Sequence, residues 1–225
     1  MKEGDFAKIE YTGRAAGRVF DTTDAEKAKK EKIFNPRAKY GAVLVPVGKG
    51  VAVKGLDEEL LNAKAGDSRT VKLAPEKAFG KRNAELVKLI PIGRFREQNV
   101  DPKPGMVLDF DGQPARIQSV SGGRVMVDFN HELAGQEVEY EFRVLGVFEK
   151  AEDKVPALAE DLVPGTKASF SAGTVTATAG EGVKKNTDFI VSKMRFVSQL
   201  FAYIPEVKRV SFTEEYEKEG KAATQ

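Results

Sequence analysis

The sequence predicts a protein of the α+β class, in which antiparallel strands dominate and the helices are short. Apolar and polar residues alternate in several short segments, which is the pattern of half-buried strands. Turns that contain glycine separate these segments, and two other segments carry the spacing of an amphipathic helix. At 225 residues the chain has room for one large or two small domains.

The composition removes several classes of enzyme. The chain contains no cysteine, which excludes disulfides, thiolate zinc sites, iron–sulfur clusters and cysteine nucleophiles. It contains one histidine, His131, so multi-histidine metal sites are excluded as well. Neither the phosphate-binding pattern G-x-x-x-x-G-K-[ST] nor the dinucleotide-binding pattern G-x-G-x-x-G occurs. We therefore expect an activity that needs no metal and no cofactor.

The charge balance and the apolar segments limit the partners. Lys and Arg number 36 and Asp and Glu number 34, and this net charge of +2 argues against a protein that coats nucleic acid. The first residues, M-K-E-G-D-F, carry charges where a secretory signal needs an apolar stretch. No segment approaches the roughly 20 apolar residues that span a bilayer. We expect a soluble, cytoplasmic protein that binds neither nucleic acid nor membranes.

Residues 1–82 are expected to form mainly strands. Alternation occurs at 7–11, 43–47 and 70–73, and Pro46 in the second of these segments suits a sheet edge. A short amphipathic helix is expected over 56–65, with Gly66 closing it. Thr23 has the capping-box spacing to Glu26 and precedes the lysine-rich run 27–32. This run lacks an apolar face, so we expect a solvated helix or loop there.

Residues 83–130 have the pattern of a separate small unit. Pro91 interrupts an apolar stretch over 86–95, and a proline-rich joint follows at 101–105. Three strands are expected at 106–110, 115–119 and 125–129, the first two joined by Asp111-Gly112, a strong hairpin signal. The clearest strand of the chain comes afterwards, over 138–144, where apolar residues alternate with charged ones.

The last part of the chain, beyond about residue 152, has a third pattern. We expect a short helix over 156–163, strands within 167–178, a helix over 187–204 and a strand over 207–212. The helix over 187–204 carries two adjacent apolar stripes, whereas one stripe suffices to cover a small sheet. The stripes are Ile190, Met194, Val197, Phe201 and Ile204, and Phe189, Phe196, Leu200 and Tyr203.

This excess of apolar surface predicts a homodimer through the C-terminal segment. A bare patch of that size is uncommon on a monomer, and burying it against a second copy in a two-fold arrangement is the simplest solution. The alternative is that the C-terminal segment packs on the first part of its own chain.

Four motifs in the first part of the chain stand in a recognisable order. They are Y-T-G at 11–13, V-F-D-T at 19–22, V-G-K-G-V-A-V-K-G-L-D-E-E-L at 47–60 and A-F-G at 78–80. With F-N-H-E-L-A-G at 129–135 and E-V-E-Y-E-F-R-V at 137–144, they resemble the FKBP family of peptidyl-prolyl cis/trans isomerases. The insertion before His131 resembles the insert-in-flap domain of SlyD-type members, and the added tail resembles the long archaeal type.

The resemblance implies an FKBP-like antiparallel half-barrel with a short helix, a small β-rich insert-in-flap domain and a C-terminal α+β domain. The implied isomerase domain comprises residues 1–82 plus 131–152. The insert comprises residues 83–130, and the C-terminal domain, a candidate for dimerisation, comprises residues 153–225.

The resemblance also implies a proline-binding pocket. The residues at its positions are Tyr11, Phe20, Asp21, Val53, Leu56, Phe79 and Phe142, with Val43 and Ala52 as neighbours. In the family, the backbone N–H at the position of Val53 holds a substrate carbonyl and the acid at Asp21 orients polar groups at the rim. Leu56 stands where some members carry Trp. Phe79 stands where many carry Tyr, so a hydroxyl that contacts macrolide drugs is absent there.

Taken one at a time, these residues have plainer interpretations. Tyr11, Phe20 and Phe142 are also typical of a core, Asp21 suits a turn, and His131 suits a loop that it stabilises by hydrogen bonds. The apolar stretch 86–95 fits either the core of the small unit or a surface that binds client chains. The candidate client-binding residues are Leu86, Val87, Leu89, Ile90 and Phe95.

The expected function is a prolyl isomerase with chaperone activity toward unfolded or partly folded chains that contain proline. Resonance sustains a barrier of ~18–20 kcal/mol to peptide rotation, and proline is the residue for which cis lies within about 0.5–1 kcal/mol of trans. An apolar pocket that removes water from the X-Pro amide favours the twisted, less polar form without proton transfer.

Two other functions remain open at this point. The first is a non-catalytic holdase chaperone that uses the FKBP unit as a scaffold. The second is a nucleic-acid-docking module, suggested by 18 basic and 12 acidic residues within 1–82, but this charge density gives it weak support.

Overall fold

The structure of the chain is a computed structural model, and it describes residues 1–180 and 188–214. The chain forms two compact units. The first contains residues 1–14, 18–71 and the chain from 139 onward, and the second contains residues 15–17 and 72–138. The division into three domains with the boundaries given above stays a prediction. No helix within the described residues has both the length and the apolarity to cross a bilayer.

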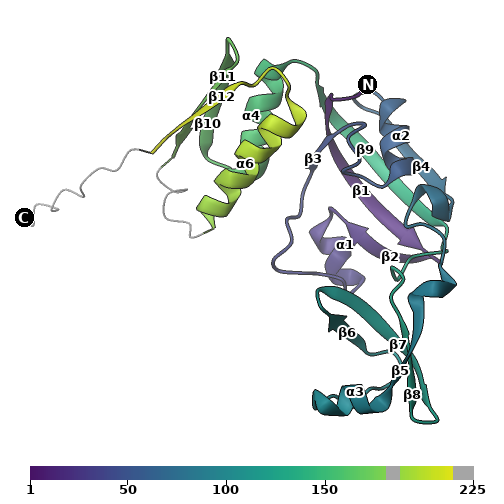
Figure 1. Ribbon diagram of the computed structural model, residues 1–225. Coiled ribbons are helices and arrows are strands. Elements are labelled where there is room, and N and C mark those ends of the chain that lie inside the picture. Colours follow the sequence, from purple (N-terminus) through teal and green to yellow (C-terminus); the bar gives the residue numbers. More distant parts are fainter. Residues whose placement is uncertain (181–187, 215–225) are drawn as a thin grey trace, which may run out of the picture. The chain divides into compact units, whose positions relative to one another are not determined.

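The first unit is built on a five-stranded sheet in which β1 and β9 are long neighbouring strands (Figure 1). The strand order is β2-β1-β9-β4, and β3 pairs with β1. Phe6 lies opposite Pro46 and Ile9 opposite Val43, so the proline occupies an edge strand, which confirms that prediction. The bounds are β1 Phe6–Ala15, β2 Arg18–Thr22, β3 Val43–Pro46, β4 Ser68–Leu73 and β9 Val138–Phe148.

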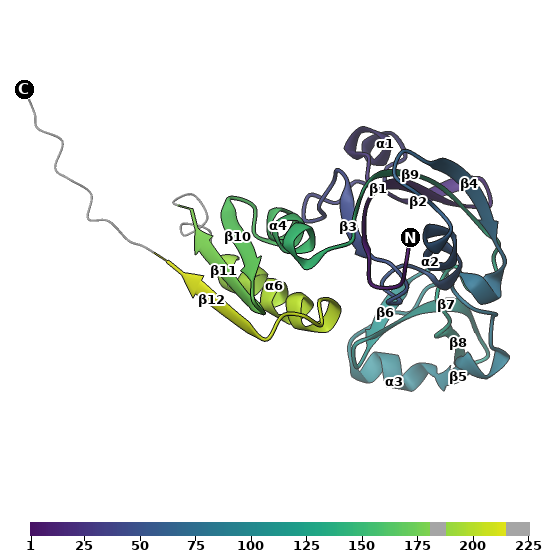
Figure 2. The same ribbon diagram turned by 90° about the horizontal axis from the view of Figure 1, so that it is seen from above.

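Helix α2, Lys54–Leu61, lies on the inner side of this curved sheet (Figure 2). Its apolar residues Leu56 and Leu60 are buried, as expected for the stripe that faces a sheet. The expected range 56–65 needs correction, because the helix starts earlier and Asn62 rather than Gly66 forms the C-cap. Gly66 instead donates its N–H to the carbonyl of Val144 on β9 at 2.8 Å, which directs the chain into β4.

Helix α1, Ala25–Lys30, confirms a solvated helix near the lysine-rich run. Its N-cap is Asp24 rather than the expected Thr23. Asp24 Oδ1 accepts hydrogen bonds from the N–H groups of Glu26 and Lys27, at 2.9 and 3.0 Å. The carboxylate is well suited to this position, because it satisfies two N–H groups that have no partner within the helix.

The last part of the first unit consists of two helices that cover one face of a three-stranded sheet (Figure 2). In the order β10-β11-β12, β10 runs antiparallel and β12 parallel to the central strand. The parallel pair needs a crossover connection, and α6 lies within it. The bounds are α4 Ala151–Leu162, β10 Thr166–Ser171, β11 Thr174–Ala179, α6 Phe189–Tyr203 and β12 Arg209–Thr213.

Helix α4 begins five residues before the expected range 156–163, and Pro156 lies inside it. Proline usually ends a helix, because it cannot donate to the carbonyl four residues earlier. Here the buried residues Ala151, Val155 and Leu158 follow helical spacing on both sides of the proline. Their burial offsets the lost hydrogen bond, and Pro156 itself is exposed.

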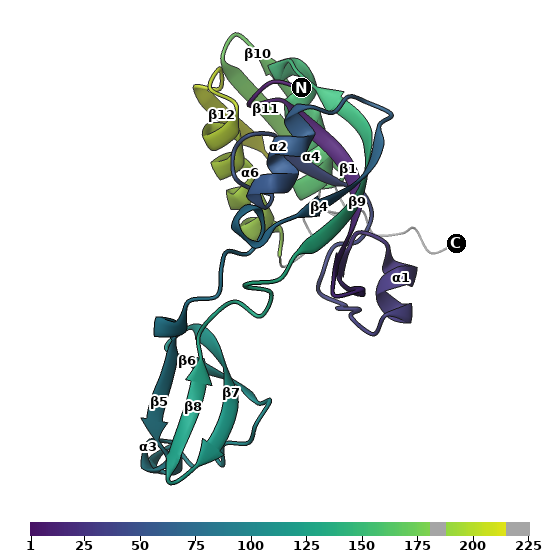
Figure 3. The same ribbon diagram turned by 90° about the vertical axis from the view of Figure 1, so that its right-hand side faces the viewer.

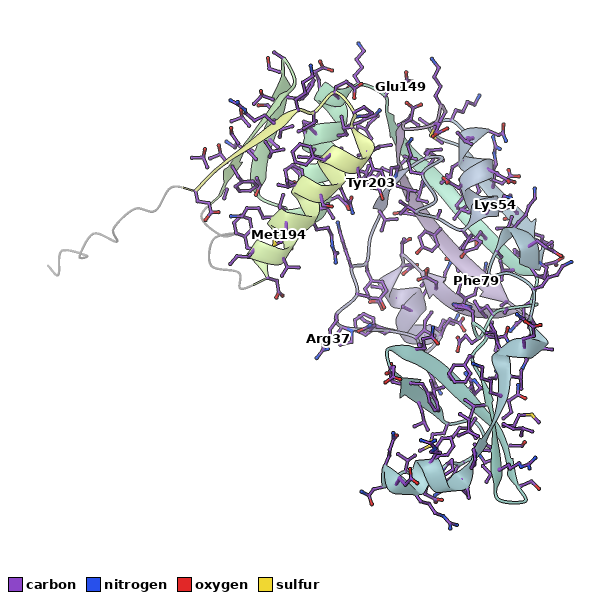
Figure 4. All side chains as sticks on the ribbon, viewed as in Figure 1. Arg37, Lys54, Phe79, Glu149, Met194 and Tyr203 are labelled. Carbon is purple, nitrogen blue, oxygen red and sulfur yellow. The ribbon has the colours of Figure 1, made fainter. Side chains whose placement is uncertain are left out.

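Helix α6 buries one side and exposes the other. Phe189, Phe196 and Leu200 are buried, and Ile204 just beyond the helix is buried with them, contrary to the expected stripe. The exposed side holds what we call the α6 patch, and its members are 51–68% exposed: Ile190, Val191, Met194 and Phe201. Met194 and Tyr203 lie along this helix in Figure 4. Residue 187, the expected first residue, lies outside the described residues.

The second unit contains a four-stranded antiparallel sheet in the order β5-β8-β7-β6 (Figure 3). The expectation of three strands missed β5, which ends at Pro91 and lies at the edge, where a missing N–H does little harm. Buried Phe95 of α3 packs with apolar residues of β7 and β8. The bounds are β5 Val87–Pro91, α3 Ile92–Glu97, β6 Val107–Phe110, β7 Gln113–Ser121 and β8 Arg124–Asp128.

The turn between β6 and β7 confirms the hairpin predicted at Asp111-Gly112. Both residues have positive φ, 54° and 84°, as a type I′ turn requires. Phe110 lies opposite Gln113 across this turn.

The two ends of the insert are tied to each other within the second unit. Asn83 N–H donates to Asn130 Oδ1 at 2.8 Å, and Asn130 Nδ2 donates to the Asn83 carbonyl at 2.9 Å. Asn130 and Gln118 also donate to the Asp128 carboxylate, which pairs with Arg82. Burial acts to raise the pKa of Asp128, but the hydrogen bonds from Asn130 and the charge of Arg82 hold it below its ordinary value.

Candidate active site

Three aromatic rings from three neighbouring strands meet on one face of the sheet in the first unit. They belong to Tyr11 on β1, Phe20 on β2 and Tyr140 on β9. The ring centroids of Tyr11 and Tyr140 are 6.0 Å apart, and those of Phe20 and Tyr140 are 5.8 Å apart with planes at 89°. Both separations are typical of favourable aromatic pairs. We call these three residues the aromatic cluster.

Gly13 leaves the space that the Phe20 ring occupies. A Cβ atom at this position lies 2.6 Å from Phe20 Cζ and 3.0 Å from Tyr140 Cε1, well inside van der Waals contact. Gly13 follows Tyr11 by two residues on β1, so both face the same side of the sheet. In the Y-T-G motif, Tyr11 therefore supplies a ring, and Gly13 beside it leaves room for the ring of Phe20.

Asp21 supplies a charged group at the edge of the aromatic cluster. It is exposed on β2, and the Tyr11 hydroxyl donates a hydrogen bond to its Oδ2 at 2.7 Å. Burial raises the pKa of Tyr11, and the hydrogen bond and charge of Asp21 raise it further. Burial, together with the charge of Asp21, raises the pKa of Tyr140 to about 12. Both phenols therefore stay protonated at neutral pH and can serve as hydrogen-bond donors.

Two threonines at the end of β2 fix the backbone of Tyr11. The Tyr11 N–H donates to Thr23 Oγ1 at 3.0 Å, and the Thr23 N–H donates to the Tyr11 carbonyl at 3.0 Å. The Thr22 hydroxyl also donates to this carbonyl, at 3.2 Å. These bonds hold the strand segment that carries the Tyr11 ring, which explains why Thr23 is not available as the cap of α1.

The loop at 48–53 and the start of α2 carry Ala52, Val53 and Leu56, which are expected in the pocket. Buried Asp57 in α2 accepts hydrogen bonds from the N–H groups of Gly48 and Gly50, at 2.7 and 2.9 Å, and so fastens the loop to the helix. Val53 is the N-cap of α2 and makes no side-chain cap hydrogen bond. Figure 4 shows the neighbouring Lys54 at this end of the helix.

The exposure of these residues suits a pocket wall. Leu56 is buried, and Val43, Ala52 and Val53 are half-buried. The first N–H groups of a helix have no partner within the helix, so this end is a suitable place for a bound carbonyl. The role expected for the Val53 N–H stays a prediction.

Tyr140, not Phe142, is the β9 residue that joins the aromatic cluster. Phe142 is 2% exposed and makes no ring contact with another aromatic side chain of the described residues. Both residues alternate onto the same face of β9, so strand periodicity alone did not separate them. The ring of Tyr140 contacts those of Tyr11 and Phe20, whereas Phe142 is buried further along the strand. The expected place of Phe142 in the proline pocket stays a prediction.

Phe79 and His131 lie together in the second unit. Their ring centroids are 4.5 Å apart with planes at 2°, a stacked arrangement. His131 Nδ1 accepts a hydrogen bond from the Leu133 N–H at 3.2 Å, in keeping with the expected loop role. The expected contribution of Phe79 to the proline pocket stays a prediction.

The five candidate client-binding residues of the insert divide by exposure. Leu86 and Leu89 are exposed, Leu89 by 57%, and Val87 and Ile90 are half-buried. Phe95 is 4% exposed and belongs to the core of the second unit, so its assignment to client binding is not supported. The periodicity of this stretch did not reveal which side faces the sheet, because β5 and α3 meet within it.

The described residues contain no group of three or more Asp, Glu or His side chains placed to hold a metal ion. At the aromatic cluster the side chains offer shape, exclusion of water and hydrogen bonds.

Three known families match regions of the chain. The family described as FKBP-type peptidyl-prolyl cis-trans isomerase matches residues 1–94. The family described as FKBP26, IF domain matches residues 88–133, and FKBP26_C-terminal matches residues 151–217. These matches confirm the resemblance drawn from the motifs, including the insert and the C-terminal extension.

Individual proteins similar to this chain are also named as peptidyl-prolyl cis-trans isomerases. The chain is 36% identical over 147 residues to the short-type peptidyl-prolyl cis-trans isomerase of Methanocaldococcus jannaschii, across 65% of this chain and 94% of that protein. It is 40% identical over 108 residues to the FKBP-type isomerase SlyD of Vibrio cholerae, across 46% and 53% of the two chains. It is 34% identical over 109 residues to the FKBP-type 16 kDa isomerase of Escherichia coli, across 46% and 72%.

Proposed function

Because the chain belongs to the family of FKBP-type peptidyl-prolyl cis-trans isomerases and is itself such an isomerase, we propose that it acts on proline-containing segments of unfolded or partly folded proteins. The observation that carries this proposal is the aromatic cluster of Tyr11, Phe20 and Tyr140 beside Asp21. Membership of this family of isomerases argues against the non-catalytic holdase.

The proposed mechanism is desolvation of the X-Pro amide. The planar amide is more polar than the twisted one, because resonance separates charge between nitrogen and oxygen. Water stabilises the planar form, so a pocket that removes water from the amide lowers the barrier to rotation. The cluster suits this role, since Tyr140 is buried and Tyr11 and Phe20 are half-buried. The mechanism requires no proton transfer.

Each residue has a role in this proposal. Phe20 and Tyr140 form walls around the proline ring, and Tyr11 is held in place by Asp21. Leu56 forms the floor, and the N–H of Val53 holds a carbonyl of the substrate. The residues proposed to complete the pocket are Val43, Ala52 and Phe79.

We assign chaperone activity to the insert, residues 83–130. Leu89 on the edge strand β5 lies opposite Met126 on β8, and Val107 on the other edge strand is exposed as well. Apolar residues at sheet edges suit the binding of unfolded segments, which offer both apolar side chains and unpaired backbone groups. A client held there is present at the pocket at a higher effective concentration.

We assign dimerisation to the C-terminal domain, residues 153–225. The α6 patch leaves four apolar side chains on one side of a helix in contact with solvent. In two copies related by a two-fold axis, the patch of one chain packs against that of the other, so a single interface removes both patches from solvent. Two pockets and two inserts then act on one long client.

A substitution on the insert tests the division of labour. Leu89→Asp places a charge on the proposed client surface and should weaken suppression of aggregation of an unfolded protein by several-fold. Isomerisation of a proline tetrapeptide should be unchanged, because so short a substrate does not reach the insert. Ser119→Asp, at an exposed position of β7, is the matched control. A Leu89→Asp chain that suppresses aggregation as well as the unmodified chain contradicts the role of this surface.

A further inference from the structure

Tyr140 combines a buried ring with a fixed position. Its side chain packs against the rings of Tyr11 and Phe20, and the residue is 4% exposed. A Cβ atom at Gly13 comes within 3.0 Å of Tyr140 Cε1, so the ring also lies close against the backbone of β1. The contacts on several sides leave the ring little freedom to rotate, and they set the place of its hydroxyl group.

The hydroxyl of Tyr140 has no hydrogen-bond partner among the described residues, in contrast to that of Tyr11. The Tyr11 hydroxyl donates a hydrogen bond to Asp21 at 2.7 Å, whereas Tyr140 interacts with Asp21 through the charge of the carboxylate and makes no hydrogen bond to it. Among the described residues, Thr166 Oγ1 is the side-chain oxygen that has neither contact with solvent nor a hydrogen-bond partner, and the Tyr140 hydroxyl is not in this state. The Tyr140 hydroxyl therefore retains contact with solvent, although its ring is buried.

A hydroxyl in this position is suited to donate a hydrogen bond to a ligand. Buried tyrosine hydroxyls usually have a partner, because an unpaired polar group among apolar side chains is unfavourable. Burial and the charge of Asp21 keep the phenol protonated, so it offers a donor at neutral pH. When a proline ring fills the cluster and expels water, the hydroxyl loses its solvent partner and needs an acceptor from the substrate.

We propose that the Tyr140 hydroxyl contacts the substrate directly and donates a hydrogen bond to the carbonyl oxygen of the proline residue. Two carbonyls flank the proline ring. A hydrogen bond to the carbonyl of the preceding residue strengthens the C–N resonance that opposes rotation. A hydrogen bond to the carbonyl of proline itself leaves that resonance untouched and anchors the ring while the preceding group turns. This inference rests on the proposed function of the aromatic cluster as the proline pocket.

The test is Tyr140→Phe, which removes one oxygen atom and keeps the ring. Isomerisation of a proline tetrapeptide should lose roughly two- to tenfold in kcat/KM, the range for one neutral hydrogen bond, mainly through KM. Tyr203→Phe removes a phenol hydroxyl from α6 and is the matched control, with unchanged kcat/KM. Thermal unfolding of both variants should stay close to that of the unmodified chain.

A second substrate identifies the acceptor. In a peptide with an ester in place of the amide after proline, the carbonyl of proline is a weaker hydrogen-bond acceptor. The unmodified chain should prefer the amide by a larger factor than the Tyr140→Phe chain does. Equal preference in the two chains, or an unchanged kcat/KM in Tyr140→Phe, overturns the inference. If Phe20→Ala is also fully active, the proposed pocket itself fails, and the two failures are thereby distinguished.

Discussion

The hydroxyl of Tyr11 lies 2.7 Å from Oδ2 of Asp21 and donates a hydrogen bond to it. The bond joins β1 to β2 at the edge of the aromatic cluster and orients the Tyr11 ring beside Tyr140. Asp21 is exposed, so its carboxylate stays solvated while it holds the phenol. In our account, Asp21 orients the pocket wall, and the rings themselves exclude the water.

This relationship predicts that Tyr11→Phe and Asp21→Ala affect isomerisation modestly and in the same way. Each removes one half of the same hydrogen bond and leaves the walls of Phe20 and Tyr140 in place. Each should lower kcat/KM on a proline tetrapeptide by a few-fold. The double variant should be little worse than either single variant, because residues that share one interaction are not additive. Fully additive losses would show that the two residues act separately.

Gly13 should be essential to the pocket although it contacts no substrate. In Gly13→Ala, the new methyl group meets Phe20 Cζ at 2.6 Å, so the ring has to move. We expect a loss of at least tenfold in kcat/KM and a decrease of ~1–3 kcal/mol in the free energy of unfolding. Gly93→Ala in α3 meets no atom within 4 Å and serves as the control for glycine replacement. A Gly13→Ala chain with full activity contradicts the position of Phe20.

The raised pKa values of the two tyrosines predict a loss of stability in alkali. A pKa raised in the folded state favours the protonated form, so the stabilisation is complete below the ordinary pKa of about 10. It is lost as the pH rises through the folded-state value, about 12 for Tyr140. Urea unfolding between pH 9 and 11.5 should therefore show a steeper decline for the unmodified chain than for Tyr140→Phe. Parallel curves would exclude this contribution.

The α6 patch predicts a dimer that a single charge disrupts. Met194→Glu places a carboxylate in the middle of the patch, where it loses its water in a dimer interface, and should give a monomer at micromolar concentration. Thr176→Glu adds the same charge to the exposed polar face of β11 and should leave the mass unchanged. Light scattering distinguishes these results. An unmodified chain with the mass of a monomer removes the proposal.

The sequence was informative about the fold wherever one side of an element is buried. The alternation of apolar and polar residues predicted most strands, and the turn residues Asp111-Gly112 predicted the hairpin between β6 and β7. Prolines caused the main errors. Pro91 concealed the edge strand β5 and Pro156 concealed the first turn of α4, because tertiary burial tolerates a proline that local preference rejects.

The site was predictable in its chemistry and less so in its members. Motif order found Tyr11, Phe20 and Asp21, which the structure brings together. It included Phe142, whose place in the pocket stays a prediction. It did not include Tyr140, since two residues on one face of a strand have the same pattern in the sequence until the neighbouring strands are in register. The role of Gly13 was also missed, because the sequence does not show that the ring of Phe20 occupies the space beside it.

The most direct test of the account is the isomerisation rate of a proline tetrapeptide with the full chain and with Phe20→Ala. Phe20 forms a wall that shields the X-Pro amide from water, so its removal should lower kcat/KM at least tenfold, about 1.4 kcal/mol in the barrier. Circular dichroism should show that the variant still unfolds cooperatively. Phe170→Ala, at a half-buried phenylalanine of β10, should isomerise at the unmodified rate. A folded Phe20→Ala chain with undiminished kcat/KM would contradict the account.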